Sequence, residues 1–431
     1  MRALLLASSA IGISIISISA ASAGGFALRE QSAYGQGTSF AGVAAGGALS
    51  SMFWNPATMT QTRGLSVEAG AAAIFPYASH TPLAGTSAAL LALGGAPDSG
   101  KDALVPNGYG AYQITPNMWI GMSFNAPFGL GVEFPFAWAG RNFAAGESQL
   151  KTYNATPSLA IKINEMISVG FGIQFQYGDV TLRRGLSAGP APSALVSTLD
   201  GDGWGFGATA GVTITPWYGT EIGIGYRSRI NQKIEGTASV NAALPGLPAN
   251  VETTIRLPDM VSVGFRSRVA PLWTLMGTFE YTNWGRIGTS NVTNTATGGI
   301  VTTVPLNYRD GYMVSFGAEY QWRPELALRA GVGYESSPVT DAVRTPLIPD
   351  NDRIWLSLGA TYQATNRLKF DVAYSHLFVQ TPNINITTPT LVPGAPATYV
   401  GTVNAHVDIV SVALRYSWYD DPPARRILPT K

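Results

Sequence analysis

Cysteine is absent from the 431-residue chain, and charged residues are scarce. Without cysteine, a disulfide framework, a thiolate metal site and a cysteine nucleophile are excluded. Charged residues make up 12% of the chain, about half of the roughly 25% that is usual for soluble globular proteins. The net charge of +1 gives no electrostatic reason to expect a nucleic-acid partner. Hydrophobic residues nevertheless make up 46% of the chain, which excludes a disordered protein.

Long apolar helices are also missing once the N-terminus is set aside. Met1-Arg2 gives a positive start, Ala3 to Ile18 form an apolar run, and Ala21-Ser22-Ala23 has the spacing of a signal-peptidase site. Residues 1–23 are therefore predicted to be a cleaved signal peptide, with an uncleaved N-terminal anchor as the alternative. After Ala23 the chain has no apolar run of about 18 residues, so we predict no membrane-spanning helix. An exported membrane protein without such helices must be a closed β-barrel.

Residues 65–418 instead alternate with a period of two. From Ile167 to Tyr177 every odd position is large and apolar or aromatic, and every even position is Ser, Gly or Gln. The segments 326–334 and 410–418 repeat the alternation, and each ends on an aromatic residue. Because successive side chains of a strand point to opposite faces, these segments predict strands with one apolar face. Apolar outward faces, polar lumens and aromatic ends are typical of transmembrane barrels.

The connections between these segments alternate in length. Short turns such as Thr115-Pro-Asn117 alternate with long connections such as 76–103 and 379–404. We therefore predict an all-β fold, a 14-stranded antiparallel transmembrane β-barrel over residues 65–418. Four of the expected strands cover 219–238, 251–268, 272–290 and 301–322. Beyond Trp418, Pro422-Pro423 forbids a continuing strand, so residues 419–431 are predicted to be a C-terminal tail.

Residues 24–64 do not have the pattern of a strand region. They are rich in Gly, Ala and Ser and contain the sequence Phe53-Trp-Asn-Pro-Ala57. A segment of this size is too small to fold alone, and a fourteen-stranded barrel is wider than the roughly eight-stranded case that its own side chains fill. We therefore predict that residues 24–64 fold inside the lumen as a plug, or hatch. A disordered tail is the alternative.

The chain resembles a known family at this point. Residues 24–42 followed by Asn55-Pro56-Ala57 are similar to the plug of the FadL/OmpP1 long-chain fatty acid transporters, a family that also includes the TodX-like aromatic-hydrocarbon porins. The stretches 125–131, 202–207 and 348–359 are also similar to it, so the resemblance covers essentially residues 24–418. The family implies a monomeric, passive outer-membrane channel of a Gram-negative bacterium, in contact with lipid and lipopolysaccharide and inserted by the barrel-assembly machinery.

The resemblance also implies a transport route. Long-chain fatty acid, or alternatively a small aromatic hydrocarbon, is bound inside the barrel under a hatch and released sideways beside a kinked third strand. Phe26 matches the family residue that occupies the internal pocket, and Asn55, Pro56 and Ala57 match the hatch motif. Asn125, Pro127, Gly129 and Gly131 fall in the expected third strand. The proline and glycines independently predict a bend there, because proline donates no ladder hydrogen bond and glycine weakens pairing.

Further candidate binding residues come from their chemistry. The aromatic residues of the second long loop predict an exposed apolar capture surface, with ordinary loop packing as the alternative; they are Phe128, Phe134, Phe136, Trp138 and Phe143. A fatty acid carboxylate needs a cation, because an unpaired buried charge is very costly. Arg183, Arg184 and Arg286 are the candidates. Arg329 and Glu319 face inward by parity on neighbouring strands and predict a structural ion pair.

An enzyme is not predicted. The histidines are His80, His376 and His406, and no Ser or carboxylate stands in a recognisable nucleophilic pattern near them. No cofactor or metal site is expected. An outer-membrane lipase and a surface-adhesin barrel remain the alternatives from other functional classes.

Overall fold

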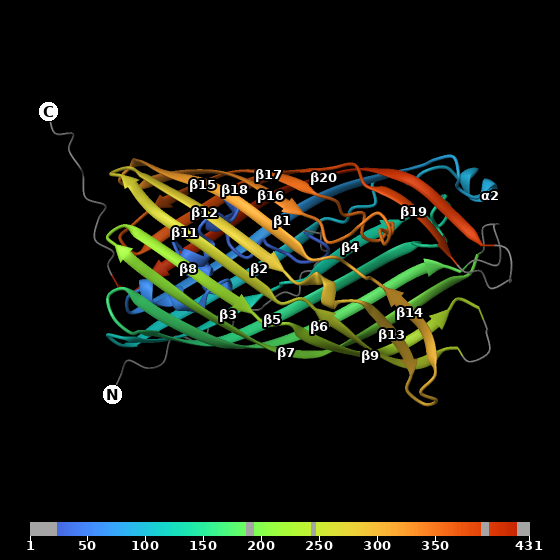
Figure 1. Cartoon of the computed structure of the whole chain (residues 1–431), viewed down its shortest axis with the longest axis horizontal. Helices are drawn as coiled ribbons and strands as arrows, with labels where there is room; N and C mark the ends of the chain where they lie inside the picture. The colour runs from blue at the N-terminus through green and yellow to red at the C-terminus, as the bar shows by residue number, and fades with distance from the viewer. Residues whose placement is uncertain (1–23, 187–193, 243–246, 389–395, 420–431) are drawn as a thin grey trace, which may run out of the picture.

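The structure is a computed structural model that describes residues 24–186, 194–242, 247–388 and 396–419. The predicted signal peptide, residues 1–23, and all but the first residue of the predicted C-terminal tail lie outside the described residues. Figure 1 shows one elongated barrel. Among the described residues, no helix is both long enough and apolar enough to cross a membrane.

Fourteen strands form a closed ring in which each strand is antiparallel to the next, as predicted. In ring order they are β1 (Leu65–Pro82), β2 (Ala103–Thr115), β3 (Met118–Asn125), β5 (Gly146–Lys162), β6 (Ile167–Gly185), β7 (Val196–Trp217), β8 (Thr220–Arg227), β11 (Met260–Ala270), β12 (Trp273–Thr282), β15 (Gly311–Arg323), β16 (Leu326–Ser336), β17 (Arg353–Gln363), β18 (Leu368–Val379) and β20 (Ala397–Ser417). The ring closes where β20 pairs with β1, from Ser66 opposite Ser417 to Pro82 opposite Gly401.

Six shorter strands extend the wall at the end that carries the long loops (Figure 1). They are β4 (Gly129–Phe134), β9 (Ile230–Val240), β10 (Ala249–Leu257), β13 (Thr289–Asn294), β14 (Ile300–Pro305) and β19 (Asn383–Thr388). The expectation of unbroken strands over 219–238, 251–268, 272–290 and 301–322 is therefore wrong. Between β10 and β11, Pro258 has no N–H to donate, so the ladder is interrupted there. The outer pieces pair with one another, β9 with β10, β10 with β13 and β13 with β14, and β9 joins them to β7 of the ring.

The two faces of each strand differ as the alternation predicts. On β6, Phe171, Ile173 and Phe175 are exposed on the outer face, whereas Gln174 and Gln176 are buried on the inner face. Exposed aromatic residues such as Trp273 and Trp322 lie at strand ends. The outside of the barrel is thus an apolar surface with aromatic borders, which is the arrangement suited to lipid.

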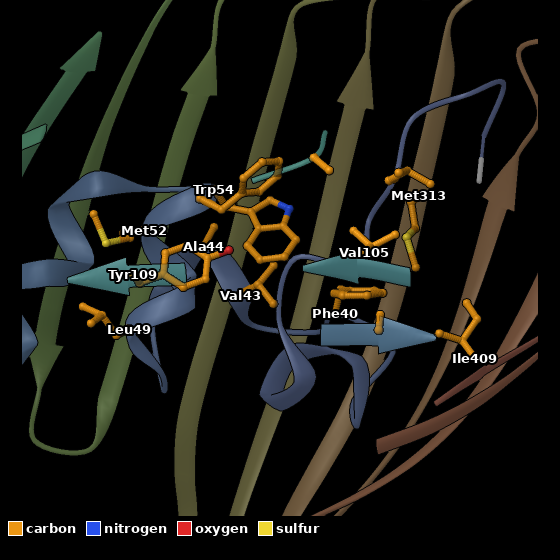
Figure 2. Packing of buried hydrophobic residues seen from close by; sticks show 14 of the residues in the cluster. Phe40, Val43, Ala44, Leu49, Met52, Trp54, Val105, Tyr109, Met313 and Ile409 are labelled. Atoms are coloured by element: carbon orange, nitrogen blue, oxygen red, sulfur yellow. The ribbon is translucent and has the colours of Figure 1, made fainter. Parts of the chain in front are cut away.

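Residues 24–64, here called the N-terminal segment, lie inside the barrel. The segment contains α1 (Ala33–Gln36), η1 (Val43–Ala45), η2 (Leu49–Phe53) and η3 (Pro56–Gln61). The remaining helical turns are α2 (Ala88–Leu91) and η4 (Trp284–Arg286), both in long connections. Figure 2 shows how Phe40, Val43 and Trp54 of the segment pack among wall residues such as Val105 and Met313. This buried apolar contact holds the segment against the inner wall.

Ion pairs on the inner wall also hold the N-terminal segment. Arg329 on β16 contacts Glu319 on β15 at 3.2 Å, which confirms the predicted pair, and Asp371 on β18 at 3.2 Å. The Tyr34 hydroxyl of the segment donates to Glu319 over 2.9 Å. The Arg329 guanidinium lies 4.2 Å from the centre of the Tyr34 ring. Tyr34 of the N-terminal segment therefore contacts both members of the Arg329–Glu319 ion pair on the inner wall.

Candidate functional site: the wall interruption and the internal pocket

The barrel wall is interrupted on its third strand, as predicted. β3 ends at Asn125 and β4 begins at Gly129, and both pair with β5. Asn125 lies opposite Asn154 and Gly129 opposite Lys151, so four steps on one side face three on the other, and one extra residue bulges. Pro127 lies in the bulge, where its missing N–H costs no ladder hydrogen bond.

The interruption also separates the third strand from β2. The β2–β3 ladder ends at Gly108 opposite Phe124, although β2 continues to pair with β1 as far as Ala103. Farther along, a single bridge between Gly100 and Val132 reconnects the two sides. In the described sheet, residues 103–107 of β2 therefore have a partner strand on one side only. We call this interval the wall interruption.

The first residues of the N-terminal segment occupy the wall interruption. Ala27 forms an antiparallel bridge with Phe128. The Leu28 N–H donates to the Pro127 carbonyl over 2.8 Å, and the Gly129 N–H donates to the Phe26 carbonyl over 2.9 Å. Residues 26–28 thus act as a very short strand added to the edge of β4.

Gln31 closes the inner side of the same interval. Its side-chain amide donates to the Ala126 carbonyl over 2.8 Å, and its Oε1 accepts from Asn125 Nδ2 over 3.3 Å. The Tyr109 hydroxyl of β2 donates to the Gln31 carbonyl over 2.5 Å. One plug residue therefore connects the two strands that the interruption separates.

Phe26 is buried at the centre of an aromatic cluster. Its ring lies 4.8 Å from the ring of Trp284 and 6.0 Å from that of Phe128. Only 3% of Phe26 is exposed. Tyr308 adds a further ring 5.9 Å from Trp284. Phe26, which the family resemblance places in the internal pocket, is therefore held between Phe128, just before β4, and Trp284, just after β12.

A small internal cavity, of about 60 Å³, adjoins this cluster. The N-terminal segment contributes Leu28, Phe53 and Trp54, and the wall contributes Phe128, Ile230 and Met260. The polar exceptions are Arg29, Gln174, Arg227 and Glu280, together with two hydroxyl side chains. The cavity is thus an apolar pocket with a small number of placed polar groups, which is the usual composition of a ligand site.

Arg227 on β8 is the cation that sequence reasoning missed. Only 6% of the residue is exposed, and its guanidinium donates to the Phe53 carbonyl over 2.9 Å and to Gln174 Oε1. It also lies 4.1 Å from the centre of the Phe53 ring. Within the described part of the chain no carboxylate forms an ion pair with it. The alternation of β8 places Arg227 on the same inner face as Gly223 and Gly225, which the sequence could predict. The residues that surround its side chain could not be predicted in this way.

Arg29 has a different environment in the same pocket. It forms ion pairs with Glu280 on β12 and with Glu335 on β16, the latter at 2.9 Å. Trp54 Nε1 donates to Glu280 over 3.2 Å, and Trp355 Nε1 donates to Glu335 over 2.9 Å. These bonds fix the carboxylates, so Arg29 serves to attach the N-terminal segment to the wall.

The hatch motif, Asn55-Pro56-Ala57, connects turns of the N-terminal segment to the barrel wall. Asn55 caps η3 by accepting from the Ala57 N–H over 3.0 Å, with Pro56 as the first helical residue. Its Nδ2 donates to the Ala44 carbonyl over 2.8 Å and to the Val212 carbonyl of β7 over 2.9 Å. Asn55 therefore joins two turns of the segment to the barrel wall.

The predicted exposed aromatic surface in the second long loop is wrong for two of its members. Phe134 and Trp138 are buried, with stacked rings 4.7 Å apart, and Trp138 packs against Tyr399 at 5.4 Å. These side chains therefore pack the second long loop against β20 instead of forming an exposed surface. Phe136 is exposed, Phe143 is half-buried, and Phe128 lines the internal pocket instead.

The three predicted carboxylate-binding arginines lie at the loop end, away from the internal pocket lining. Arg183 and Arg184 are exposed, and Arg184 donates to Thr302 Oγ1 over 3.2 Å. Arg286 is exposed and forms an ion pair with Asp259 at 3.1 Å. None of the three is brought to the cavity that contains Phe128 and Arg227.

A second small cavity, of about 70 Å³, lies among the strand extensions at the loop end. Its lining is almost entirely apolar and comes from β6, β7, β9, β10, β13 and β14. Leu182, Leu199, Ile234 and Val251 are among the side chains that face it. We call it the outer pocket. It was not predicted, because its walls come from six separate strands.

The chain matches known proteins over nearly its whole length. A family model described as "Outer membrane protein transport protein (OMPP1/FadL/TodX)" matches residues 14–418. The long-chain fatty acid transport protein of Salmonella typhi is 28% identical over 407 residues, which are 87% of this chain and 92% of that protein. Outer membrane protein P1 of Haemophilus influenzae is 27% identical over 452 residues, which are 94% of this chain and 97% of that protein.

Solved structures have the same fold. A FadL homologue from Pseudomonas aeruginosa superposes with a TM-score of 0.83 at 22% identity, covering 92% of this chain and 100% of that chain. The toluene transporter TodX of Pseudomonas putida gives a TM-score of 0.67 at 14% identity, covering 89% of this chain and 98% of that chain. The chain therefore belongs to the OMPP1/FadL/TodX family and is a channel, not an enzyme, that transports hydrophobic compounds across the outer membrane of a Gram-negative bacterium.

Proposed function

We propose that this channel takes up long-chain fatty acids, by passive binding in the internal pocket and lateral release through the wall interruption. The observation that carries the proposal is Arg227, a buried cation without a carboxylate partner among the described residues, in an otherwise apolar pocket. A fatty acid supplies both the acyl chain for that pocket and the carboxylate for that cation.

The energies favour an anionic ligand with a long tail. Each CH₂ group moved from water into the pocket contributes roughly 0.8 kcal/mol. An ionised carboxylate buried without a partner would be prohibitively unfavourable, whereas a guanidinium can receive it through two parallel hydrogen bonds. Arg227 already donates to Phe53 and Gln174, both of which it can exchange for a carboxylate without leaving an ion unpaired.

The proposed route begins at the outer pocket, whose apolar lining suits capture of a poorly soluble molecule. Exposed Phe136 is a second candidate for first contact. Phe26 gates the internal pocket, because its ring fills the aromatic cluster that adjoins the cavity. Release requires residues 26–28 to leave the edge of β4, which uncovers Asn125, Pro127, Gly129 and Gly131 at the wall interruption.

Aromatic hydrocarbons are the second candidate substrate. The rings of Phe26 and Phe128 each pack edge-to-face against Trp284, and a small aromatic molecule can join this cluster. Such a molecule would leave Arg227 bonded to Phe53 and Gln174. The two candidates therefore differ in their need for the charge of Arg227.

The proposed assembly is a monomer in contact with lipid and lipopolysaccharide, inserted by the barrel-assembly machinery. It is supported by the pairing of β1 with β20, by which a single chain closes the ring without a strand from a second copy.

The test compares Arg227→Met with Arg227→Lys and with the control Arg286→Met, whose side chain is exposed and paired with Asp259. Binding of labelled oleate and of toluene is measured on purified barrels of confirmed heat-modifiable mobility. Loss of hydrogen bonds to a charged group costs roughly 1.5–3 kcal/mol, so we expect Arg227→Met to weaken oleate binding about tenfold to a hundredfold and leave toluene binding unchanged. Arg227→Lys should recover part of the loss. Equal oleate binding by Arg227→Met and wild type would refute the proposed role.

A further inference from the structure

The paired strands β9 and β10 present different residues on their two faces. Ile234 of β9 and Val251 of β10 line the outer pocket on the inner face. The residues that alternate with them, such as Lys233 and Arg256, are exposed on the outer face. The pair of strands therefore has an apolar inner face and a polar outer face, and the proposed function uses the inner face alone.

The outer face of these strands brings several cations together. Arg256 of β10 lies directly opposite Asn231 of β9, so its diagonal neighbours are Arg229 and Lys233. Diagonal neighbours in an antiparallel pair are roughly 7–8 Å apart. All of these side chains are exposed. They form one surface, here called the outer cation patch, which consists of Arg229, Asn231, Lys233 and Arg256.

Two cations of the patch lack a counter-charge. Lys233 contacts Glu235 at 2.7 Å and Glu252 at 3.6 Å, so its charge is compensated. In the part of the chain that the structure describes, the guanidinium groups of Arg229 and Arg256 form neither an ion pair nor a hydrogen bond. Like charges on neighbouring positions of a sheet repel each other. An anion placed between the two guanidinium groups removes this repulsion.

The outer cation patch lies just beyond the aromatic border of the wall. Tyr226, which shortly precedes Arg229 in the chain, is exposed on the outer face of β8. Trp204 and Phe206 of β7 are exposed as well. Aromatic side chains mark the interface between a membrane and water, and long loops mark the outer side of an outer-membrane barrel. The patch is therefore level with the lipid headgroups of the outer leaflet.

On the membrane side of the aromatic border the outer face is apolar. Ile224 of β8 lies opposite Val263 of β11, and Ile222 lies opposite Phe265. Ile224, Val263 and Phe265 are all exposed. An apolar surface thus continues from the cation patch towards the middle of the membrane. A molecule that covers both surfaces must combine anionic groups with acyl chains.

We propose that the outer cation patch is a binding site for lipopolysaccharide, with the phosphates of its lipid A part on Arg229 and Arg256 and its acyl chains against the apolar face of β8 and β11. A guanidinium group binds a phosphate through two parallel hydrogen bonds, and the Asn231 amide offers further donors. An acidic protein supplies anions without acyl chains, and a phospholipid such as phosphatidylglycerol supplies one phosphate for two arginines.

The site has a consequence for the outer pocket. Because β9 and β10 form part of the wall of that pocket, the bound lipid lies directly behind it. Lipopolysaccharide thus supports the strands that carry the apolar lining from their outer face. The inference does not depend on which substrate the channel transports.

The test is native mass spectrometry of the whole protein, extracted in detergent and titrated with lipid A that carries two phosphates. The double variant Arg229→Gln, Arg256→Gln should bind it about tenfold to a hundredfold more weakly than wild type, because hydrogen bonds to a charged group are lost. The matched control is Arg323→Gln, which removes an exposed arginine from the last residue of β15, at the end opposite the long loops. It should bind lipid A as wild type does.

The other ligands of the titration decide what the patch recognises. Lipid A without phosphates and phosphatidylglycerol should both bind wild type at least tenfold more weakly than lipid A with two phosphates. Heat-modifiable mobility shows whether each variant is folded, and the single variants Arg229→Gln and Arg256→Gln, each with an expected intermediate affinity, keep the comparison valid if the double variant is not. Equal binding of lipid A by wild type and the folded variants would overturn the proposal. Equal binding of dephosphorylated lipid A or of phosphatidylglycerol by wild type would overturn it as well.

Discussion

Gly223→Val should unseat the N-terminal segment from the barrel wall. Gly223 is an inward-facing residue of β8, and a Cβ atom built on it would lie 1.8 Å from the Ala44 carbonyl oxygen and 2.3 Å from the Ala44 carbonyl carbon. Both atoms belong to the backbone of η1, so no side-chain rotation relieves the clash. Asn55 donates to the same Ala44 carbonyl, so movement of η1 also strains the hatch motif.

The size of the effect follows from the cost of overpacking. Adding methyl groups to a well-packed core costs about 1–3 kcal/mol, and each 1.4 kcal/mol is a factor of about ten in an equilibrium. The fraction of channels with a displaced segment should therefore rise about tenfold to a hundredfold. The assay is ion conductance of single channels in planar bilayers, together with the sensitivity of cells to a large hydrophilic antibiotic.

The matched control is Gly110→Val on the outer face of β2, where an added Cβ meets no atom within 4 Å. Both variants should insert normally, as judged by heat-modifiable mobility, and only Gly223→Val should conduct. A correctly inserted Gly223→Val barrel that is as tight as wild type and Gly110→Val would refute the view that close contact with the wall keeps the segment seated.

Three further changes have definite expected outcomes. Asn55→Ala removes three hydrogen bonds of about 1 kcal/mol each, so occasional channel openings should appear in bilayer recordings; silence would contradict its joining role. Replacing Pro127 and Gly129 together with Val should favour a continuous strand and slow oleate uptake by cells, and undiminished uptake would reject lateral release. Trp138→Ala should cost about 3–5 kcal/mol of loop packing and expose the loops to protease, whereas unchanged digestion would show that the loops close without it.

The sequence predicts the wall of this protein well because the wall is a local pattern. The alternation from Ile167 to Tyr177 assigns inner and outer faces, since a strand places neighbours on opposite sides. Arg329 and Glu319 could be paired from parity alone. Pro127 indicates the interruption of the third strand, because its chemistry excludes a normal ladder.

The lumen is less predictable because it depends on which distant strands meet. Arg227 on β8 reaches Phe53 of the N-terminal segment, 174 positions earlier, and nothing local to either residue indicates this contact. Phe134 and Trp138 were expected to be exposed because loop residues usually are, but both are buried against His80 of β1, and Trp138 also packs against Tyr399 of β20. The burial of these side chains depends on the arrangement of all the barrel strands, which the local sequence does not show.

The bond pattern of residues 26–28 has a mechanical consequence. Phe26 carries both the ring that sits against Trp284 and the carbonyl that accepts from Gly129, and two backbone hydrogen bonds in all attach these residues to the edge of β4. If residues 26–28 are displaced as one unit, as the proposed release requires, the Phe26 ring leaves its aromatic cluster and both backbone hydrogen bonds break in one step. The proposed emptying of the pocket and opening of the wall are then two results of one displacement.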